Sequence, residues 1–127
     1  MMPRDTNPHG TIFGGVILSY IDQAGAIGAY REVIRAGGRP PYLATVALNK
    51  VEFHQPVLVG DLVRFLTRLK RIGRTSITMH VTVEADRGQE TLQVTEAEIV
   101  FVGVDPTTPT RRPTPLLPAA LGAIPGP

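Results

Sequence analysis

An apolar run around a single carboxylate constrains this chain more than any other feature. From Val16 to Ala29 nearly every residue is apolar or small, and Asp22 is the one charged residue in the run. The run is too short for a membrane span, and a carboxylate at its middle disfavours one further. A carboxylate among apolar side chains carries a desolvation cost, so it is normally paired or used for chemistry. Asp22 is therefore the first candidate for a functional residue.

The same run predicts a long helix from Gly15 to Arg35. Apolar residues recur at helical spacing, and Gly37-Gly38 followed by two prolines is a typical helix end. The helix is apolar nearly all round, so we expect other parts of the structure to cover most of its surface. Its glycines and alanines allow another backbone to approach closely, and packing must offset their cost in helix propensity.

The remainder of the domain has the period-two pattern of strands. We expect four strands, over residues 42–53, 61–72, 75–85 and 92–104. Gly73-Arg74 and Asp86-Arg87-Gly88 provide short connections, which favour an antiparallel meander of the last three strands. The fold class is therefore α+β, with an antiparallel sheet wrapped around a long central helix. We expect one domain over residues 1–105 and an extended or disordered proline-rich tail over 106–127.

Composition narrows the possible functions. The chain has no cysteine, which excludes disulfides, thiolate metal sites and a cysteine nucleophile. A net charge of +2 and 6% aromatic residues disfavour a nucleic-acid-binding module. Without a recognisable signal peptide or membrane span, we expect a cytoplasmic protein. His9, His54 and His80 are scattered and form no recognisable ligand pattern, so we expect no metal site.

Five sequence blocks, in order, carry a resemblance to a known family. They are DTNPHGTIFGG, YIDQAGAIGA, VEFHQPVLVGD, GRTSIT and VTEAEIVFVGVDP, and with their flanks they span roughly residues 3–113. Together they resemble the bacterial acyl-CoA thioesterases of the hotdog fold. The resemblance implies hydrolysis of acyl-CoA to free CoA and a carboxylic acid, with acyl-CoA as the substrate and no cofactor. It also implies homodimers with shared active sites, assembled as a trimer of dimers into a hexamer. The family has a strand before the DTN segment, where this chain has only Met1-Met2, so we expect that strand to be absent or reduced.

The resemblance places the catalytic acid at Asp22 and an asparagine that orients the thioester or the attacking water at Asn7. Thioester hydrolysis also needs donors for the developing oxyanion, and Gly14-Gly15 at the helix start can present free backbone N–H groups. Some seven or eight residues separate this pair from Asp22, roughly 10–12 Å along a helix. One chain therefore does not easily aim both groups at one carbonyl carbon, whereas two antiparallel helices of a dimer can. Gly14-Gly15 can also be explained as a tight turn without a catalytic role, and Asn7 can also be explained as part of an Asx turn.

CoA carries phosphates, so basic residues beside free backbone N–H groups are expected at its site. The connection Gly73-Arg74-Thr75-Ser76 matches a family motif and is the first candidate. Arg111 and Arg112, which resemble a basic element after the last strand, are the second. Phe53, Pro56 and Val57 are candidates to line an acyl or pantetheine channel. For each arginine the simpler interpretation is a solvated charge, and for each apolar residue it is a place in the core.

Two other functions are compatible with the fold. A dehydratase or hydratase would pair the acid with a histidine, and no histidine follows Asp22 in the predicted helix. The second alternative is a non-catalytic domain that binds acyl-CoA without turnover. The sequence is compatible with it, because an intact Asp22 is necessary for hydrolysis but not sufficient. Release of free CoA distinguishes enzyme from binding domain.

Overall fold

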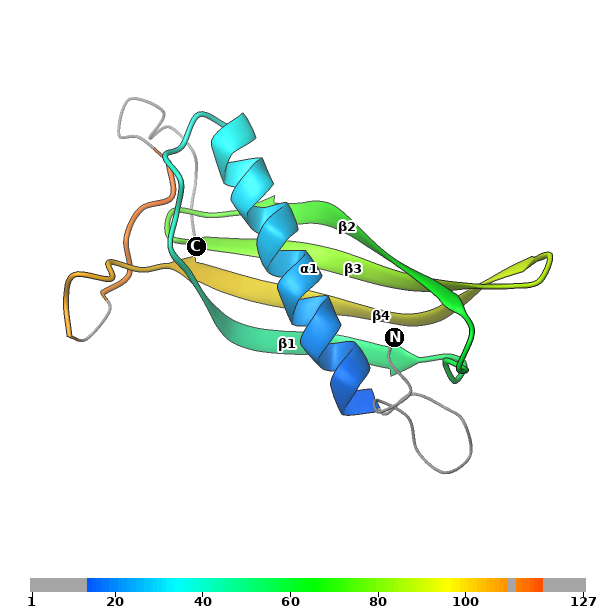
Figure 1. Cartoon of the computed structure of the whole chain (residues 1–127). Coiled ribbons are helices and arrows are strands. Elements are labelled where there is room, and N and C mark those ends of the chain that lie inside the picture. The colour runs from blue at the N-terminus through cyan, green and yellow to red at the C-terminus, as the bar shows by residue number, and fades with distance from the viewer. Residues whose placement is uncertain (1–13, 110–111, 118–127) are drawn as a thin grey trace.

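The computed structural model describes residues 14–109 and 112–117, and it contains one long helix and four strands in that part of the chain (Figure 1). The elements, in chain order, are α1 (Gly14–Arg35), β1 (Leu43–Phe53), β2 (Leu62–Ile72), β3 (Ser76–Arg87) and β4 (Glu90–Gly103). Each expected element is present, and its ends lie within one or two residues of the expected ones. The first strand of the family, which we expect to be absent or reduced, would fall before Gly14, outside the described residues.

The four strands form one antiparallel sheet in the order β1-β4-β3-β2. The last three strands are a meander, as predicted, and β1 returns to pair with β4. Figure 1 shows α1 lying diagonally across one face of this sheet. Among the described elements, β1 and β2 are therefore the two edge strands.

The helix ends as the glycine pair predicts. The Gly38 N–H donates to the Val33 carbonyl at 2.9 Å and the Gly37 N–H to the Ile34 carbonyl at 3.0 Å. Gly37 has a φ of 95°, the left-handed conformation that glycine adopts without strain. These two bonds form a Schellman motif, which satisfies carbonyls at the end of the helix and turns the chain towards β1.

The core lies between α1 and the sheet. Its largest fully buried side chains come from one side of the helix and from alternate positions of β3 and β4, and include Ile17, Ile21, Val33, Ile77, Met79, Ile99 and Phe101. A Cβ added to Gly28 would lie 2.6 Å from the Thr67 hydroxyl oxygen, and one at Gly25 would lie 3.2 Å from the Phe101 ring. The small residues of the helix thus allow the close approach to the sheet that the sequence predicts.

One expectation about the helix does not hold for the single chain. The sequence predicts a helix covered on most sides, but the sheet covers one side only. Tyr20, Ile27, Tyr30 and Ile34 are 36%, 61%, 44% and 41% exposed on the other side. A four-stranded sheet is one layer, so it cannot enclose a helix that is apolar nearly all round.

Part of the predicted tail packs on the domain. Val104 pairs with Pro113, the Thr114 N–H donates to the Gly103 carbonyl at 2.7 Å, and Leu116 is 4% exposed. The proline-rich composition does not reveal that a leucine in this segment reaches the core. The packed domain therefore extends beyond residue 105 and includes residues 113–117.

Candidate active site

Asp22 lies on α1, partly buried, where the helix passes the edge strand β1. The Thr45 hydroxyl on β1 donates a hydrogen bond of 2.5 Å to Asp22 Oδ1. In the described part of the chain, no arginine, lysine or histidine forms an ion pair with Asp22. The carboxylate thus has one oxygen held by a neutral donor, and no basic side chain of the described residues neutralises it.

Thr45 is a site residue that the sequence analysis missed. A threonine is ordinary in a strand, and its distance of 23 positions from Asp22 has no recognisable pattern. Only the packing of α1 over β1 brings the two side chains together. Thr45 itself is exposed in the single chain, so the space beside the carboxylate is accessible.

Gly14 and Gly15 begin α1, as expected. The first turn of a helix has backbone N–H groups without intrahelical partners, and this first turn contains no acidic side chain. A Cβ added to Gly15 would meet no atom within 4 Å, so the described residues leave the helix start open. Asp22 lies eight residues from Gly14, about 12 Å along the helix axis. The structure therefore does not bring the predicted acid and the predicted oxyanion donors together within one chain.

A small cavity of about 260 Å³ lies between the start of α1 and the loop after β1. Phe53, Pro56 and Val57, which the sequence analysis grouped as candidate channel residues, line it together with Ile17 and Thr95. The Thr95 hydroxyl is buried and has no hydrogen-bond partner among the described residues. Such a group is available to a polar atom that enters the cavity.

An ion pair holds the loop that borders this cavity. Arg87 donates from Nη2 to Asp61 Oδ2 at 2.7 Å and from Nε to Asp61 Oδ1 at 3.1 Å, and also to the Pro56 carbonyl at 3.0 Å. The Leu58 N–H donates to the same carboxylate at 2.8 Å. Hydrogen bonding from Arg87 lowers the pKa of Asp61 below its usual value, and the Leu58 N–H adds to this effect. The loop is therefore anchored to β3 by a bidentate pair.

The first predicted CoA-binding segment, Gly73–Ser76, lies at one end of the sheet, beside the end of β4 and the C-terminal residue Leu116. Within the β2–β3 connection, the Gly73 N–H donates to the Ser76 carbonyl at 2.7 Å. The Leu116 N–H donates to the Arg74 carbonyl at 3.0 Å, and the Gly103 N–H donates to the Thr75 carbonyl at 2.8 Å. Arg74 and Arg112 are both exposed, whereas Arg111 lies outside the described residues, as does Asn7.

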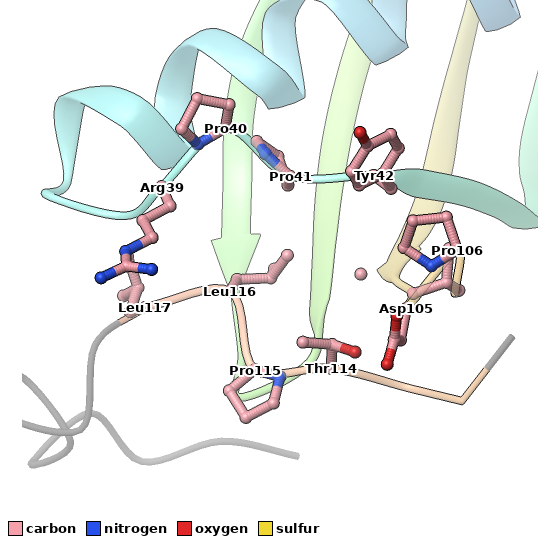
Figure 2. A pocket seen from close by; sticks show the side chains of 12 residues that line it. Arg39, Pro40, Pro41, Tyr42, Asp105, Pro106, Thr114, Pro115, Leu116 and Leu117 are labelled. Carbon is pink, nitrogen blue, oxygen red and sulfur yellow. The ribbon is translucent and has the colours of Figure 1, made fainter. Parts of the chain in front are cut away.

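A cavity of about 430 Å³ lies beside the C-terminal segment at the end of the sheet (Figure 2). It is bounded by the segment from Arg39 to Tyr42, the end of β4 and the C-terminal residues 114–117. Figure 2 shows Leu116 and Thr114 on one side of it and Pro41 and Tyr42 on the other. Its lining includes none of the predicted catalytic residues, so its size alone does not connect it with Asp22.

Known proteins resemble this chain in sequence and in structure. The sequence profile described as the thioesterase superfamily matches residues 9–92. The chain belongs to the thioesterase superfamily. Among relatives of this superfamily, the acyl-CoA thioester hydrolase YciA of Salmonella typhimurium is 40% identical over 111 residues, which cover 83% of this chain and 78% of the relative. An uncharacterised acyl-CoA thioester hydrolase of Haemophilus influenzae is 40% identical over 109 residues, 82% of this chain and 67% of the relative.

Solved structures of superfamily members confirm the hotdog fold. A hexameric hotdog-fold thioesterase of Campylobacter jejuni has a TM-score of 0.78 at 38% identity, over 96% of this chain and 88% of that one. A hexameric thioesterase of Yersinia pestis has a TM-score of 0.77 at 37% identity, over 92% of this chain and 88% of that one. Within the residues that the structure describes, no helix combines the length and apolar character needed to cross a membrane.

Proposed function

We propose that this thioesterase-superfamily chain hydrolyses acyl-CoA thioesters to free CoA and a carboxylic acid. The observation that carries the proposal is the partly buried Asp22 carboxylate on the central helix, hydrogen-bonded at one oxygen to Thr45 of the edge strand β1. The names and folds of the relatives support the same reaction class. A cytoplasmic location stays a prediction from the sequence.

The reaction needs one activating group and one oxyanion site. Asp22 either accepts a proton from the attacking water or attacks the thioester carbonyl itself. When water attacks, its oxygen bonds to the carbonyl carbon, the C–S bond breaks, and the proton held by Asp22 passes to the CoA thiolate. When Asp22 attacks, the C–S bond breaks to give an anhydride between the acyl group and Asp22, and water then hydrolyses this anhydride, which releases the carboxylic acid, restores the Asp22 carboxylate and supplies the proton to the thiolate. Backbone N–H groups of Gly14 and Gly15 stabilise the oxyanion, with the positive end of the helix dipole adding to their effect.

The separation of about 12 Å between these groups makes the site a shared one in this proposal. The helix of one chain supplies Asp22, and the helix of a second chain supplies the glycine N–H groups. The exposed apolar side chains of α1, from Tyr20 to Ile34, and the unpaired edge of β1 with Val46 and Leu48 exposed, provide a surface that a second copy would cover. We extend the proposal to a trimer of such dimers, because the similar proteins of Campylobacter jejuni and Yersinia pestis are hexameric.

The substrate is assigned to two regions. We place the acyl or pantetheine part in the small cavity beside Phe53, where the Thr95 hydroxyl has no partner in the described chain. We place the CoA nucleotide at the end of the sheet where Gly73–Ser76 meets the C-terminal segment, with Arg111 and Arg112 close in sequence to that segment. Asn7 orients the thioester in this proposal.

Release of CoA from a panel of acyl-CoA esters, followed with a thiol reagent, tests the function. Asp22→Asn keeps the shape of the side chain but removes the base, so kcat should fall by about 10²-fold or more. Thr45→Val removes one hydrogen bond to the carboxylate and should lower kcat about tenfold with little change in KM. Turnover retained by Asp22→Asn would remove this residue from the mechanism, and binding without CoA release by the natural chain would favour a binding domain.

Mixed oligomers test the shared site separately. Chains with Asp22→Asn and chains with Gly15→Val should each be inactive alone, whereas a heterodimer would contain one site with both groups intact. In a freely exchanging equal mixture about half the chains are in heterodimers, so about a quarter of the natural activity should return. The open space around Gly15 indicates that valine fits there, and circular dichroism checks this.

The matched control for the mixture pairs Asp22→Asn chains with chains that carry both changes. No combination of these chains assembles an intact site, so no activity should return. If the first mixture also stays inactive although its chains are folded and exchange, Asp22 has its oxyanion donors within its own chain.

A further inference from the structure

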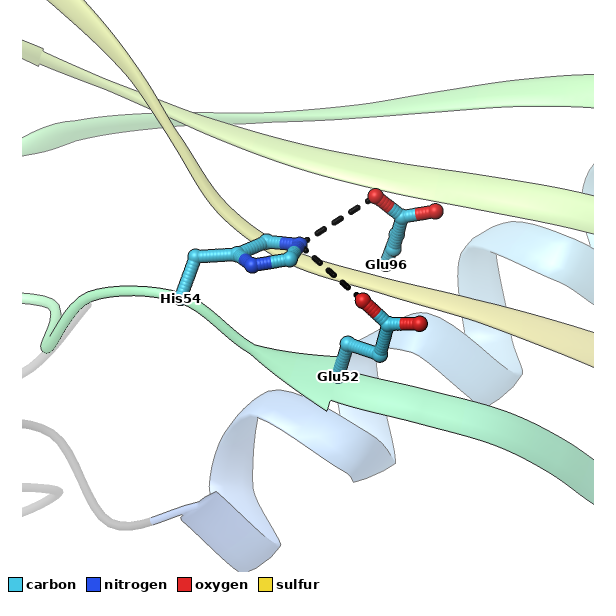
Figure 3. Close-up of side chains that lie close together, drawn as sticks. All are labelled: Glu52, His54 and Glu96. Atoms are coloured by element: carbon cyan, nitrogen blue, oxygen red, sulfur yellow. Dashed lines mark hydrogen bonds and ion pairs between the residues drawn. The ribbon is translucent and has the colours of Figure 1, made fainter.

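Three metal-ligating side chains lie together on the face of the sheet opposite α1. Glu52 is the next-to-last residue of β1, His54 directly follows β1, and Glu96 is on β4. Glu52 and Glu96 are direct cross-strand partners, and His54 lies two residues beyond Glu52, so all three side chains project from the same face. Figure 3 shows one nitrogen of the His54 ring directed towards both carboxylates.

The distances within this cluster are those of ligands around one ion. His54 Nε2 lies 3.2 Å from Glu96 Oε2 and 3.7 Å from Glu52 Oε2. The three ligand atoms all lie within 4.8 Å of one another. With zinc–nitrogen and zinc–oxygen bonds near 2.0–2.2 Å, two ligands of a tetrahedral ion are about 3.3 Å apart. Small rotations of the Glu52 side chain are therefore enough to form a three-ligand site.

The charges of the cluster also call for a cation. Like charges directly opposite each other on neighbouring strands are destabilising, and Glu52 and Glu96 are such a pair. Among the described residues, no lysine or arginine forms an ion pair with either carboxylate; the cations Lys50 and Lys70 pair with Glu98 instead. An imidazole that binds a metal is neutral, so with a bound ion the two carboxylates carry a charge of −2, which a divalent cation balances.

Neighbouring groups hold one of the ligands in place. Gln93 donates a hydrogen bond to Glu96 Oε2, and His80 Nε2 lies 3.8 Å from Glu96 Oε1. Groups that orient metal ligands in this way commonly contribute to affinity. His80, which is mostly buried, also provides a second imidazole next to the carboxylate that faces His54.

We propose that Glu52, His54 and Glu96 bind a divalent transition-metal ion, with zinc as the best fit, and that water completes the coordination. A mixed set of imidazole and carboxylate ligands favours zinc over magnesium or calcium, which prefer oxygen ligands alone. The ion joins the end of the edge strand β1 to β4. The sequence analysis expected no metal site, since the histidines are scattered along the chain. Spacing in the sequence does not reveal this cluster, because its ligands become neighbours only through the register of β1 and β4.

Zinc titration of the untagged, chelator-treated chain, followed by calorimetry, tests the site. We expect about one zinc ion per chain with a dissociation constant below about 100 µM. Glu52→Gln, Glu96→Gln and His54→Ala should each weaken binding at least tenfold. Zinc at a large excess over that constant should also raise the Tm of the natural chain by several degrees, and it should not raise the Tm of the variants. Cobalt in place of zinc should give visible d–d absorption bands.

Glu90→Gln, which removes an exposed carboxylate from the start of β4, is the matched control and should bind zinc like the natural chain. The glutamine variants should remain folded without metal, because each removes one member of a like-charge pair; they decide the outcome if His54→Ala does not fold. The proposal is overturned if the natural chain takes up no zinc, or if the three variants bind it as well as Glu90→Gln does. Binding of magnesium as tight as that of zinc would also overturn the proposal, since the carboxylates alone would then explain the binding of a cation.

Discussion

Replacing Leu116 by alanine measures how firmly the C-terminal segment belongs to the domain. The Leu116 side chain is 4% exposed and packs on the backbone of Gly103, where a Cβ would lie 2.7 Å from the leucine Cδ2 atom. Burial of a leucine stabilises a protein by about 1.5–3 kcal/mol. Gly103 adjoins the leucine side chain and has no side chain of its own that can move into the vacated space, so a cavity term is added. We expect a loss of about 3 kcal/mol in the free energy of unfolding.

Urea unfolding followed by circular dichroism gives this value, at one fixed protein concentration because assembly contributes to stability. For a chain of this size the same loss lowers the Tm by about 10 °C. Leu62→Ala is the matched control, since Leu62 is 64% exposed and should change the free energy by no more than about 0.5 kcal/mol. A Leu116→Ala variant as stable as that control would refute the packing argument.

Two other predictions concern the substrate and pH. Arg74→Ala should raise KM for acyl-CoA more than it lowers kcat, because a contact with the nucleotide is equal in the ground and transition states; steady-state kinetics checks this, and an unchanged KM would remove Arg74 from the site. The Asp61–Arg87 pair should give a pH-dependent stability. The pKa of Asp61 is lower in the folded chain than in the unfolded one, so the stabilisation is fully present above about pH 5 and is lost as pH falls through the folded pKa. Urea unfolding between pH 3 and pH 7 should show this loss, and Asp61→Asn should show less of it.

Local patterns were enough to predict most of the fold. Helical spacing, the Gly37-Gly38 pair and the strict alternation of β2 and β3 are each properties of neighbouring residues, and each element formed where its pattern lay. The position of Asp22 on the helix followed in the same way. Whether Asp22 is the catalytic acid stays a prediction.

Contacts between distant segments could not be predicted from these patterns. Thr45 reaches Asp22 because α1 crosses β1, and Leu116 is buried because Gly38 and Gly103 leave room for it. Glu52 and Glu96 are neighbours through the strand register alone. The exposure of Ile27 has another cause. The apolar pattern of the helix predicts burial in an assembled protein, whereas the structure describes a single chain.

The two register shifts in β1 determine which changes in length this strand tolerates. The first lies between Thr45 and Ala47 and the second between Asn49 and Glu52, where Lys50 has a φ of 51°. At each shift, β1 has one more residue than the matching part of β4. The first shift therefore changes which of the alternate positions along β1 face the helix, and the second shift changes them back. Deleting Lys50 alone would leave one residue between Asn49 and Glu52, as there is between Glu98 and Glu96, so Glu52 would stay on the outer face and Phe53 on the inner face. During evolution, a single deletion at either shift is therefore compatible with the register, because the residues at the two ends of β1 keep their sides of the sheet without a compensating change.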